Sequence, residues 1–314
     1  MTARAQRAGE RLRELLAGPR PLVAGGCYDG LSAAVLQNAG FPALFLSGAG
    51  VSASSAGLPD LGLISMDELV TVARRVVAQS RVPVMVDADT GFGNELNVIR
   101  TVRELADAGA AAIMLEDQVA PKRCGHLAGK SIVDRETFIR RIAAASIARG
   151  DSGMLIIART DALAVAGMDE ALARMEDAVA YGADLTFIEA PTTRDEIGRI
   201  GRESAGIPVF GLAGGRVPSL DVGELHELGF PLVSYPGVAM MPMISEVTRA
   251  AKAVLMAGGH APLDEYRMVP RDIFEAVGLS DWLDLEDHLG GDLAELRRRA
   301  RPGASGRTGS REAS

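Results

Sequence analysis

The chain has 314 residues, of which 47% are hydrophobic and 24% are charged, enough to bury the core of one large α/β domain. Its formal net charge of −8 argues against a nucleic-acid-binding protein, because such proteins present a basic surface. No run of about 18 or more apolar residues predicts a transmembrane helix, and no apolar segment of a secretory signal follows the N-terminus. Two cysteines are too few for a disulfide framework. These features predict a cytoplasmic protein with neither nucleic-acid nor membrane partners.

Short apolar runs alternate with longer amphipathic segments along the chain. The runs are rich in Val, Ile, Leu or Phe, as buried parallel strands are. In chain order they are residues 21–25, 43–47, 82–87, 111–116, 154–159, 185–189, 207–212 and 231–235. Eight strand–helix units predict a closed (β/α)8 barrel of the TIM type, with a doubly wound open sheet as the alternative.

Helix start and stop signals separate these runs. Residues 65–68 and 193–196 each fit a capping box, and residues 168–181 carry apolar residues at helical spacing before Gly182. Residues 237–257 and 270–297 predict extra C-terminal helices. We therefore expect one barrel domain with a helical extension over residues 1–297, and a disordered tail rich in Gly, Ser and Arg over residues 298–314.

Carboxylates follow two of the predicted strands. In such barrels the functional residues lie at the carboxyl ends of the strands. Asp87 and Asp89 are two residues apart and are expected to lean to the same side, where they need a cation or a shared proton. With Glu116 they predict an oxygen-rich site suited to Mg²⁺ or Mn²⁺. Zinc is disfavoured, because the nearby soft and nitrogen ligands belong to a separate loop around Cys124.

Two further strand ends carry groups that can bind an anion. Arg159 is suited to bidentate contact with a substrate carboxylate, and the alternative is a structural ion pair with Asp161 or Glu189. A small turn after the second run offers backbone N–H groups to an anion: Ser47, Gly48 and Ala49.

A thiol lies in a basic loop after the fourth strand. Three cationic or titratable side chains flank Cys124: Lys122, Arg123 and His126. Such surroundings bring a thiol pKa into a range in which the group exchanges a proton near neutral pH, whereas the alternative is a small buried cysteine. Gly125 and Gly129 predict that residues 121–130, here called the lid, move over the site.

Several segments occur in an order that is familiar. They are Leu46–Gly50, Gly57–Asp60, Asp87–Gly91, Glu116–Gln118, Pro121–His126, Ile157–Asp161, Gly182–Asp184 and Glu189–Ala190. They run over about residues 20–290, and the Lys-Arg-Cys-Gly-His run at 122–126 is the most discriminating of them. Through these motifs the chain resembles the isocitrate lyase and phosphoenolpyruvate mutase superfamily, and within it the methylisocitrate lyase-like members.

The resemblance implies a β/α barrel that binds a divalent metal, usually Mg²⁺, together with a small-molecule carboxylate substrate, a 2-oxo acid or its enolate. It implies Asp87 as the direct metal ligand, with the metal's waters held by Asp60, Asp89 and Glu116. Substrate contacts are implied for Ser47, Gly48, Ala49, Arg159, Gly125 and His126. In the carbon–carbon lyases of the family the loop cysteine protonates the released carbanion, which implies this role for Cys124, with Lys122 and His126 tuning it and Glu189 organising the pocket.

The chain departs from the family pattern after the seventh run. If the prolines are aligned, Phe210 stands where the family usually has Asn, and Ala213 stands where it has Glu. A ring and a methyl group cannot make the same hydrogen bonds. The far half of the substrate is therefore expected to be less polar, differently oriented or absent.

Four functions remain open at this point. The first is a Mg²⁺-dependent carbon–carbon lyase acting on a branched 2-hydroxy di- or tricarboxylate. The others are a phosphonate enzyme of the mutase type, a 2-oxo acid decarboxylase, and a binding or scaffold barrel without turnover. The resemblance also implies a homo-oligomer, a dimer or tetramer, that exchanges a C-terminal helix, for which residues 274–289 around Trp282 are the candidate.

Overall fold

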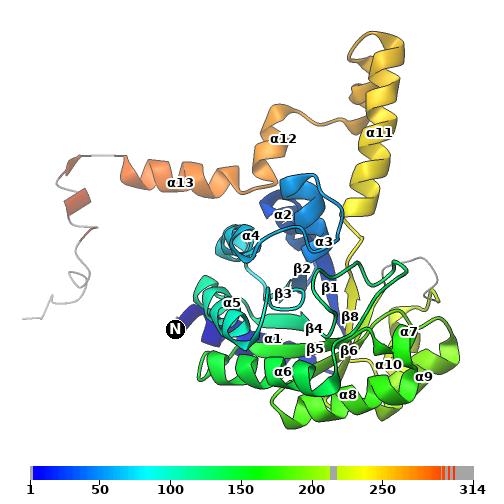
Figure 1. Cartoon of the computed structure of the whole chain (residues 1–314). Helices are drawn as coiled ribbons and strands as arrows, with labels where there is room; N and C mark the ends of the chain where they lie inside the picture. The colour runs from blue at the N-terminus through cyan, green and yellow to red at the C-terminus, as the bar shows by residue number, and fades with distance from the viewer. Residues whose placement is uncertain (1–2, 213–217, 291, 294–295, 298–299, 301–314) are drawn as a thin grey trace, which may run out of the picture. The chain divides into compact units, whose positions relative to one another are not determined.

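The computed structural model describes residues 3–212, 218–290, 292–293, 296–297 and 300. The chain divides into two compact units, Met1–Pro262 and Leu263–Ser314. Within the first unit, eight parallel strands close into a barrel in chain order, from β1 to β8 (Figure 1). The predicted TIM-type barrel is confirmed, and the open doubly wound sheet is excluded because β1 pairs with β8.

Each strand falls on one of the predicted apolar runs. The strands are β1 Leu22–Cys27, β2 Ala43–Leu46, β3 Val84–Asp87, β4 Ala112–Glu116, β5 Leu155–Thr160, β6 Leu185–Ile188, β7 Ile207–Gly211 and β8 Leu232–Tyr235. In the first unit, the helices between the strands surround the barrel, as Figure 1 shows. In chain order, the helices of the structure are α1 Ala3–Leu16, α2 Gly30–Asn38, α3 Gly48–Val51, η1 Ser52–Ala56, α4 Met66–Gln79, α5 Glu95–Ala108, α6 Arg135–Arg149, α7 Ala162–Ala166, α8 Met168–Ala180, α9 Arg194–Glu203, α10 Val222–Glu227, α11 Met240–Ala257, η2 Ala261–Tyr266, α12 Pro270–Glu275 and α13 Leu279–Leu289.

The predicted capping boxes begin α4 and α9. The hydroxyl of Ser65 accepts a hydrogen bond from the backbone N–H of Glu68, and the carboxylate of Glu68 accepts one from the backbone N–H of Ser65 at 2.7 Å. Thr193 and Glu196 make the same reciprocal pair. Each box satisfies N–H groups that a helix start leaves without partners, so both predicted starts are confirmed.

Alternate residues of each strand face two separate apolar layers. The barrel interior contains Phe45, Met85 and Leu232, and Leu12 of α1 packs with them. The opposite face of the strands packs against the helices in a larger outer layer. Because side chains alternate along a strand, a shift of one position in the sequence changes whether a side chain faces the barrel axis or the helices.

The helices after β8 leave apolar side chains exposed. None of the 18 residues of α11 is buried. In the second unit, the segment predicted to be helical over 270–297 contains α12 and α13, and Gly278, with a left-handed φ of 89°, precedes α13. The domain bounds expected from the sequence stay a prediction, and the expected disordered tail, apart from Ala300, lies outside the described residues. Among the helices of the described ranges, none is long and apolar enough to cross a membrane.

Candidate active site

Neighbouring strands bring the predicted polar residues together at one end of the barrel. Asp87 ends β3, Glu116 ends β4, Arg159 lies near the end of β5, and Glu189 follows β6. A cavity of about 200 Å³ opens there and is lined by Asp87, Arg159, Glu189 and the lid. A cavity of this volume admits a small metabolite rather than a nucleotide or an extended cofactor.

Arg159 lies at the centre of the polar side of this cavity. Its side chain is 10% exposed and forms ion pairs with Glu116 at 3.3 Å, Asp161 at 3.2 Å and Glu189 at 3.1 Å. Burial alone would lower the pKa of Arg159, but these carboxylates raise it well above its ordinary value. The structural ion pairs weighed as an alternative are therefore present, and Arg159 also lines the cavity, where it offers a fixed positive charge to a substrate carboxylate.

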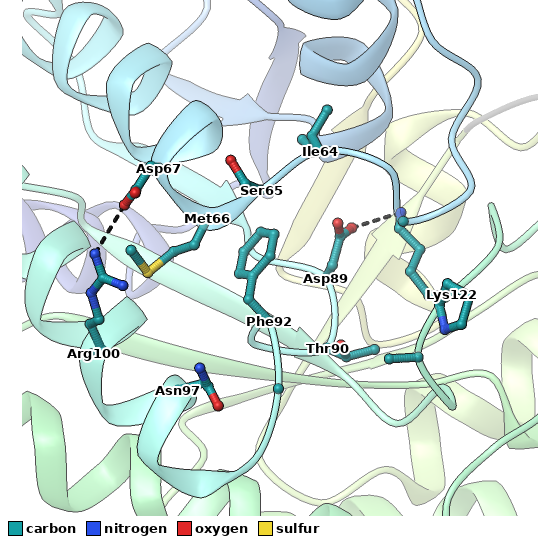
Figure 2. Close-up of a pocket in the computed structure, with 14 residues that line it drawn as sticks. Ile64, Ser65, Met66, Asp67, Asp89, Thr90, Phe92, Asn97, Arg100 and Lys122 are labelled. Atoms are coloured by element: carbon teal, nitrogen blue, oxygen red, sulfur yellow. Dashed lines mark hydrogen bonds and ion pairs between the residues drawn. The ribbon is translucent and has the colours of Figure 1, made fainter.

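Four carboxylates, here called the mouth cluster, surround a lid lysine. They are Asp60, Asp87, Asp89 and Glu116. Lys122 Nζ lies 2.6 Å from Asp89 Oδ1, as Figure 2 shows. It also contacts Asp60. Asp89 turns back toward Asp87 because its φ is 50°, so the left-handed backbone, rather than strand alternation alone, makes these two carboxylates converge.

The mouth cluster has more negative charge than the neighbouring cations neutralise. Burial, followed by the charge of Asp87, raises the pKa of Asp89 to about 7. Burial also raises the pKa of Glu116 well above its usual range, and Glu116 Oε1 is buried without a hydrogen-bond partner in the described structure. The site thus has an unused acceptor and a shortage of positive charge, and a divalent cation would supply the missing charge.

The mouth cluster suits a metal ion that keeps several of its water ligands rather than one that protein side chains coordinate throughout. Within the described ranges, no three Asp, Glu, His or Cys side chains are close enough to chelate a metal directly. Mg²⁺ usually keeps several waters and binds protein through one or two carboxylates. The residues present therefore fit Mg²⁺ held directly by Asp87, with Asp60, Asp89 and Glu116 accepting hydrogen bonds from its waters. This ligand set stays a prediction.

The lid packs against the polar side of the cavity. The backbone N–H of Cys124 donates to Asp60 O at 3.0 Å, and His126 Nε2 lies 3.4 Å from Glu189 Oε1. A Cβ at Gly125 would lie 2.4 Å from Arg159 Nη2 and 2.6 Å from Glu189 Cγ, so no side chain fits there. Gly125 is needed for this close approach rather than as a hinge.

Cys124 differs from the sequence-based expectation in its charge state. Burial raises the pKa of this thiol above its ordinary value, and the carboxylates of Asp60 and Glu189 raise it further. Lys122, expected to favour the thiolate, directs its ammonium group to Asp60 and Asp89 instead. A thiol in these surroundings keeps its proton at neutral pH, which suits a proton donor and not a nucleophile.

The turn after β2 supports the acidic side of the mouth. The Ser47 hydroxyl accepts a hydrogen bond from Gly50 N–H at 3.2 Å, while Gly48 N–H donates to Asp87 at 3.4 Å. Ser47 and Ala49 line the cavity, as expected of substrate contacts. The N–H of Gly48 is directed at a carboxylate of the protein, so in this geometry it orients Asp87.

The remaining wall of the cavity is apolar. It is formed by Phe45, Met114, Phe187, Gly211, Pro236, Met240 and Met241, with Ser234 as its hydroxyl group. The expectation that Phe210 faces the far half of the substrate is wrong. Phe210 packs edge to face on Phe230, with ring centroids 5.1 Å apart, in the outer layer. Alternation along β7 turns Val209 and Gly211 toward the axis and Phe210 away from it. Ala213 lies outside the described residues.

A second cavity, of about 570 Å³, lies beside the mouth cluster (Figure 2). Asp89 and Lys122 form part of its wall, and Phe92, Met66 and the exposed Arg100–Asp67 ion pair form other parts. Its four charged side chains form two ion pairs, Arg100–Asp67 and Lys122–Asp89, and the second pair belongs to the mouth cluster already described.

Comparisons with known proteins agree with this geometry. The phosphoenolpyruvate phosphomutase family matches residues 12–255. A 2,3-dimethylmalate lyase of Eubacterium barkeri is 45% identical over 72% of this chain and 78% of its own length. A 2-methylisocitrate lyase of Aeropyrum pernix is 37% identical over 94% of this chain and 95% of its own. The chain belongs to the phosphoenolpyruvate mutase and isocitrate lyase superfamily.

Solved structures show the same family and fold. A crystal structure of 2,3-dimethylmalate lyase superposes with a TM-score of 0.86 at 36% identity, covering 93% of this chain and 97% of that one. A phosphonopyruvate hydrolase in complex with oxalate and Mg²⁺ superposes with a TM-score of 0.80 at 29% identity, covering 89% and 98%. The family, the fold and the class of enzyme predicted from the sequence, a lyase of this superfamily, are confirmed.

Proposed function

We propose that this protein is a Mg²⁺-dependent carbon–carbon lyase that cleaves a methyl-branched 2-hydroxy dicarboxylate, of the 2,3-dimethylmalate type, into a 2-oxo acid and a simple carboxylate. The observation that carries the proposal is the position of Cys124. The Cys124 thiol, which is protonated at neutral pH because its pKa is raised, lines the cavity. The lid that carries it packs its backbone closely against Arg159 and Glu189 at Gly125.

The reaction is a retro-aldol cleavage. Arg159 binds the carboxylate on C2, and Ser47 and Ala49 bound the same end of the cavity. The 2-hydroxyl loses its proton to a carboxylate of the mouth cluster, the C2–C3 bond breaks, and its electron pair passes to C3. Cys124 then donates the thiol proton to C3, so that 2,3-dimethylmalate would yield pyruvate and propionate. When bound at Asp87, Mg²⁺ supplies positive charge that stabilises the oxygens of the 2-oxo acid.

The apolar wall favours methyl groups over a third carboxylate. Of the described residues that line the cavity, Arg159 and His126 are the only cationic or titratable basic groups, and Arg159 is assigned to the C2 carboxylate. His126 is then left for the second carboxylate. A tricarboxylate would bring one charge into contact with Phe187, Pro236 and Met240, where its desolvation would not be compensated.

A substrate panel tests this proposal. The purified protein with Mg²⁺ is given 2,3-dimethylmalate, 2-methylisocitrate, oxaloacetate and phosphonopyruvate, and 2-oxo acid and second product are measured for each. We expect the highest kcat/KM for 2,3-dimethylmalate, with propionate released in equal amount to pyruvate. Preferential cleavage of the tricarboxylate would contradict the assignment of the apolar wall.

The mutase alternative keeps support from the matching family. A transferred phosphoryl group needs several cations at close range. Lys122 is paired with Asp60 and Asp89, and Arg159 is already assigned to the C2 carboxylate. Of the described residues that line the cavity, His126 is then the only basic group left for a phosphoryl group, which favours the lyase. Pyruvate release from phosphonopyruvate would favour phosphonate chemistry, and carbon dioxide from oxaloacetate would favour decarboxylation. Tight Mg²⁺ binding without any product would favour a scaffold barrel.

The exposed C-terminal helices favour a homo-oligomer, for which a second copy of the chain is the expected partner. On α11, Met241, Ile244, Val247 and Leu255 are exposed, and on α13 Trp282 is 63% exposed. Exposed apolar faces of this kind are typical of interfaces. Light scattering on protein eluted from a size-exclusion column would measure its molar mass and so test the homo-oligomer. A monomer at micromolar concentration would contradict it. A cytoplasmic location stays a prediction.

A further inference from the structure

The two ends of the lid are paired with each other. Val119 N–H donates to Ser131 O at 2.9 Å, and Val133 N–H donates to Asp117 O at 2.8 Å. Gln118 and Ile132 form an antiparallel bridge between them. The lid therefore begins and ends on a short fixed stem, and what it does depends on the contacts of its tip.

Gln118 holds the middle of the lid through the backbone. Its Nε2 donates to Arg123 O at 2.8 Å, and its Oε1 accepts from Arg123 N–H at 3.0 Å. The same Nε2 lies 3.3 Å from Asp161 Oδ2. One buried amide thus connects the residue before Cys124 to Asp161 of the barrel.

Lys130 holds the tip of the lid in the same way. Its Nζ donates to Gly125 O at 2.5 Å and to Asp161 Oδ1 at 2.6 Å. The Lys130 side chain is 6% exposed, and the Asp161 side chain is fully buried. Buried charge-assisted hydrogen bonds are the strong ones, and this pair joins the lid backbone to the carboxylate that also binds Arg159.

We propose that Lys130 is a positioning residue that latches the lid: through Gly125 O and Asp161 it fixes Cys124 over the cavity and connects lid closure to the placement of Arg159. Lys130 does not line the cavity, so it acts through other residues and not on the substrate. The role of Cys124 as a proton donor rests on the proposed function. The latch itself rests only on these contacts.

The test compares Lys130→Met with the unaltered enzyme by two measurements. The first is the rate of Cys124 alkylation by iodoacetamide, followed by mass spectrometry. Loss of the latch should raise this rate roughly tenfold, since local opening exposes the thiol. The second is steady-state turnover of 2,3-dimethylmalate. We expect kcat to fall about 10- to 100-fold with KM changed by less than about threefold, because misplacing a reacting group costs rate more than binding.

Two internal controls make the result specific. Cys27 is fully buried, and burial raises its pKa to about 12, so it stays unmodified as long as the barrel is folded. Leu127→Met changes an exposed side chain of the same lid that has no polar group, and should leave both measurements unchanged. If Cys27 also reacts in Lys130→Met, loss of the buried Lys130–Asp161 ion pair has destabilised the fold, and the double variant Lys130→Met/Asp161→Asn, which removes both charges of that pair, is measured in its place.

Unchanged Cys124 alkylation in a folded Lys130 variant would overturn the latch. Faster alkylation with an unchanged kcat would overturn the connection between the latch and proton delivery. Failure of the proposed function would look different: the unaltered enzyme would release no pyruvate from the substrate, while the effect of Lys130→Met on alkylation would remain.

Discussion

The two sides of the barrel mouth are built in opposite ways. From β3 to β6, the strand ends supply Asp87, Glu116, Arg159 and Glu189, and nearly every charged group there contacts an opposite charge. From β7 to β8, Gly211 and Pro236 line the cavity among apolar side chains. The paired side fixes charges in position for chemistry, whereas the apolar side sets the shape available to the substrate.

This division predicts different consequences for substitutions on the two sides. Changing a residue of the paired side leaves another buried charge without its partner, which is costly. Changing a residue of the apolar side alters volume by a methyl group or a ring, which costs less and changes which substrate fits. We therefore expect variants of the paired side to lose the reaction and variants of the apolar side to change the choice of substrate.

The largest expected effect is that of Cys124→Ser. A hydroxyl is a much weaker acid than a thiol, so kcat should fall about 10³-fold, within the range that a general acid contributes. Mg²⁺ affinity, measured by titration calorimetry, should stay within about twofold because Cys124 is outside the mouth cluster. Unaltered turnover would remove the thiol from the mechanism and favour decarboxylation.

Arg159→Lys should have the next largest effect. A lysine keeps the positive charge among three carboxylates but loses the planar fork that can hold a substrate carboxylate in two places. One lost hydrogen bond to a charged group costs about 1.5–3 kcal/mol, and KM should rise about 10- to 100-fold. Initial rates over a range of substrate concentration measure this. A KM like that of the unaltered enzyme would show that Arg159 serves only its ion pairs.

Sequence reasoning located the strands and the strand-end residues because both depend on local patterns. An apolar run followed by Asp87 or Arg159 indicates a buried strand and its polar end without knowledge of its neighbours. What it missed depends on side-chain direction over long separations. Lys122 reaches Asp60 and Asp89 rather than Cys124, and Lys130 reaches Asp161 from 31 residues away.

The error at Phe210 has the same origin. An alignment by the prolines gives the position of a residue along β7 but not the face of the strand on which it lies, and a shift of one residue exchanges the two faces. The apolar run itself could have provided a signal, because Val209 and Gly211 alternate with Phe210 within it. The paired side of the mouth was thus more predictable than the apolar side.

Gly211→Ala should change the apolar side without affecting the paired one. The added Cβ would lie 2.9 Å from Phe187 Cζ and 3.0 Å from its Cε2, so this ring, which lines the cavity, must shift. We expect kcat/KM for 2,3-dimethylmalate to fall about tenfold, the usual worth of a misfitted methyl group. The kcat/KM for 2-methylmalate, which lacks the methyl group on C3, should fall by a smaller factor. Equal losses for both substrates would indicate damage to the whole site rather than to the methyl pocket.

Phe210→Leu is the matched change on the other face of the same strand, and its effect should be the smallest on catalysis. Phe210 is buried against Phe230, so the shorter side chain should lower the free energy of unfolding by about 1–2 kcal/mol, measured by urea denaturation. Because the ring points to the helices, kcat/KM for both malates should stay within about twofold, as expected for sites that share no contacts. A change of substrate preference in Phe210→Leu, with stability intact, would mean that the ring reaches the cavity after all and that the alternation along β7 does not separate packing from specificity.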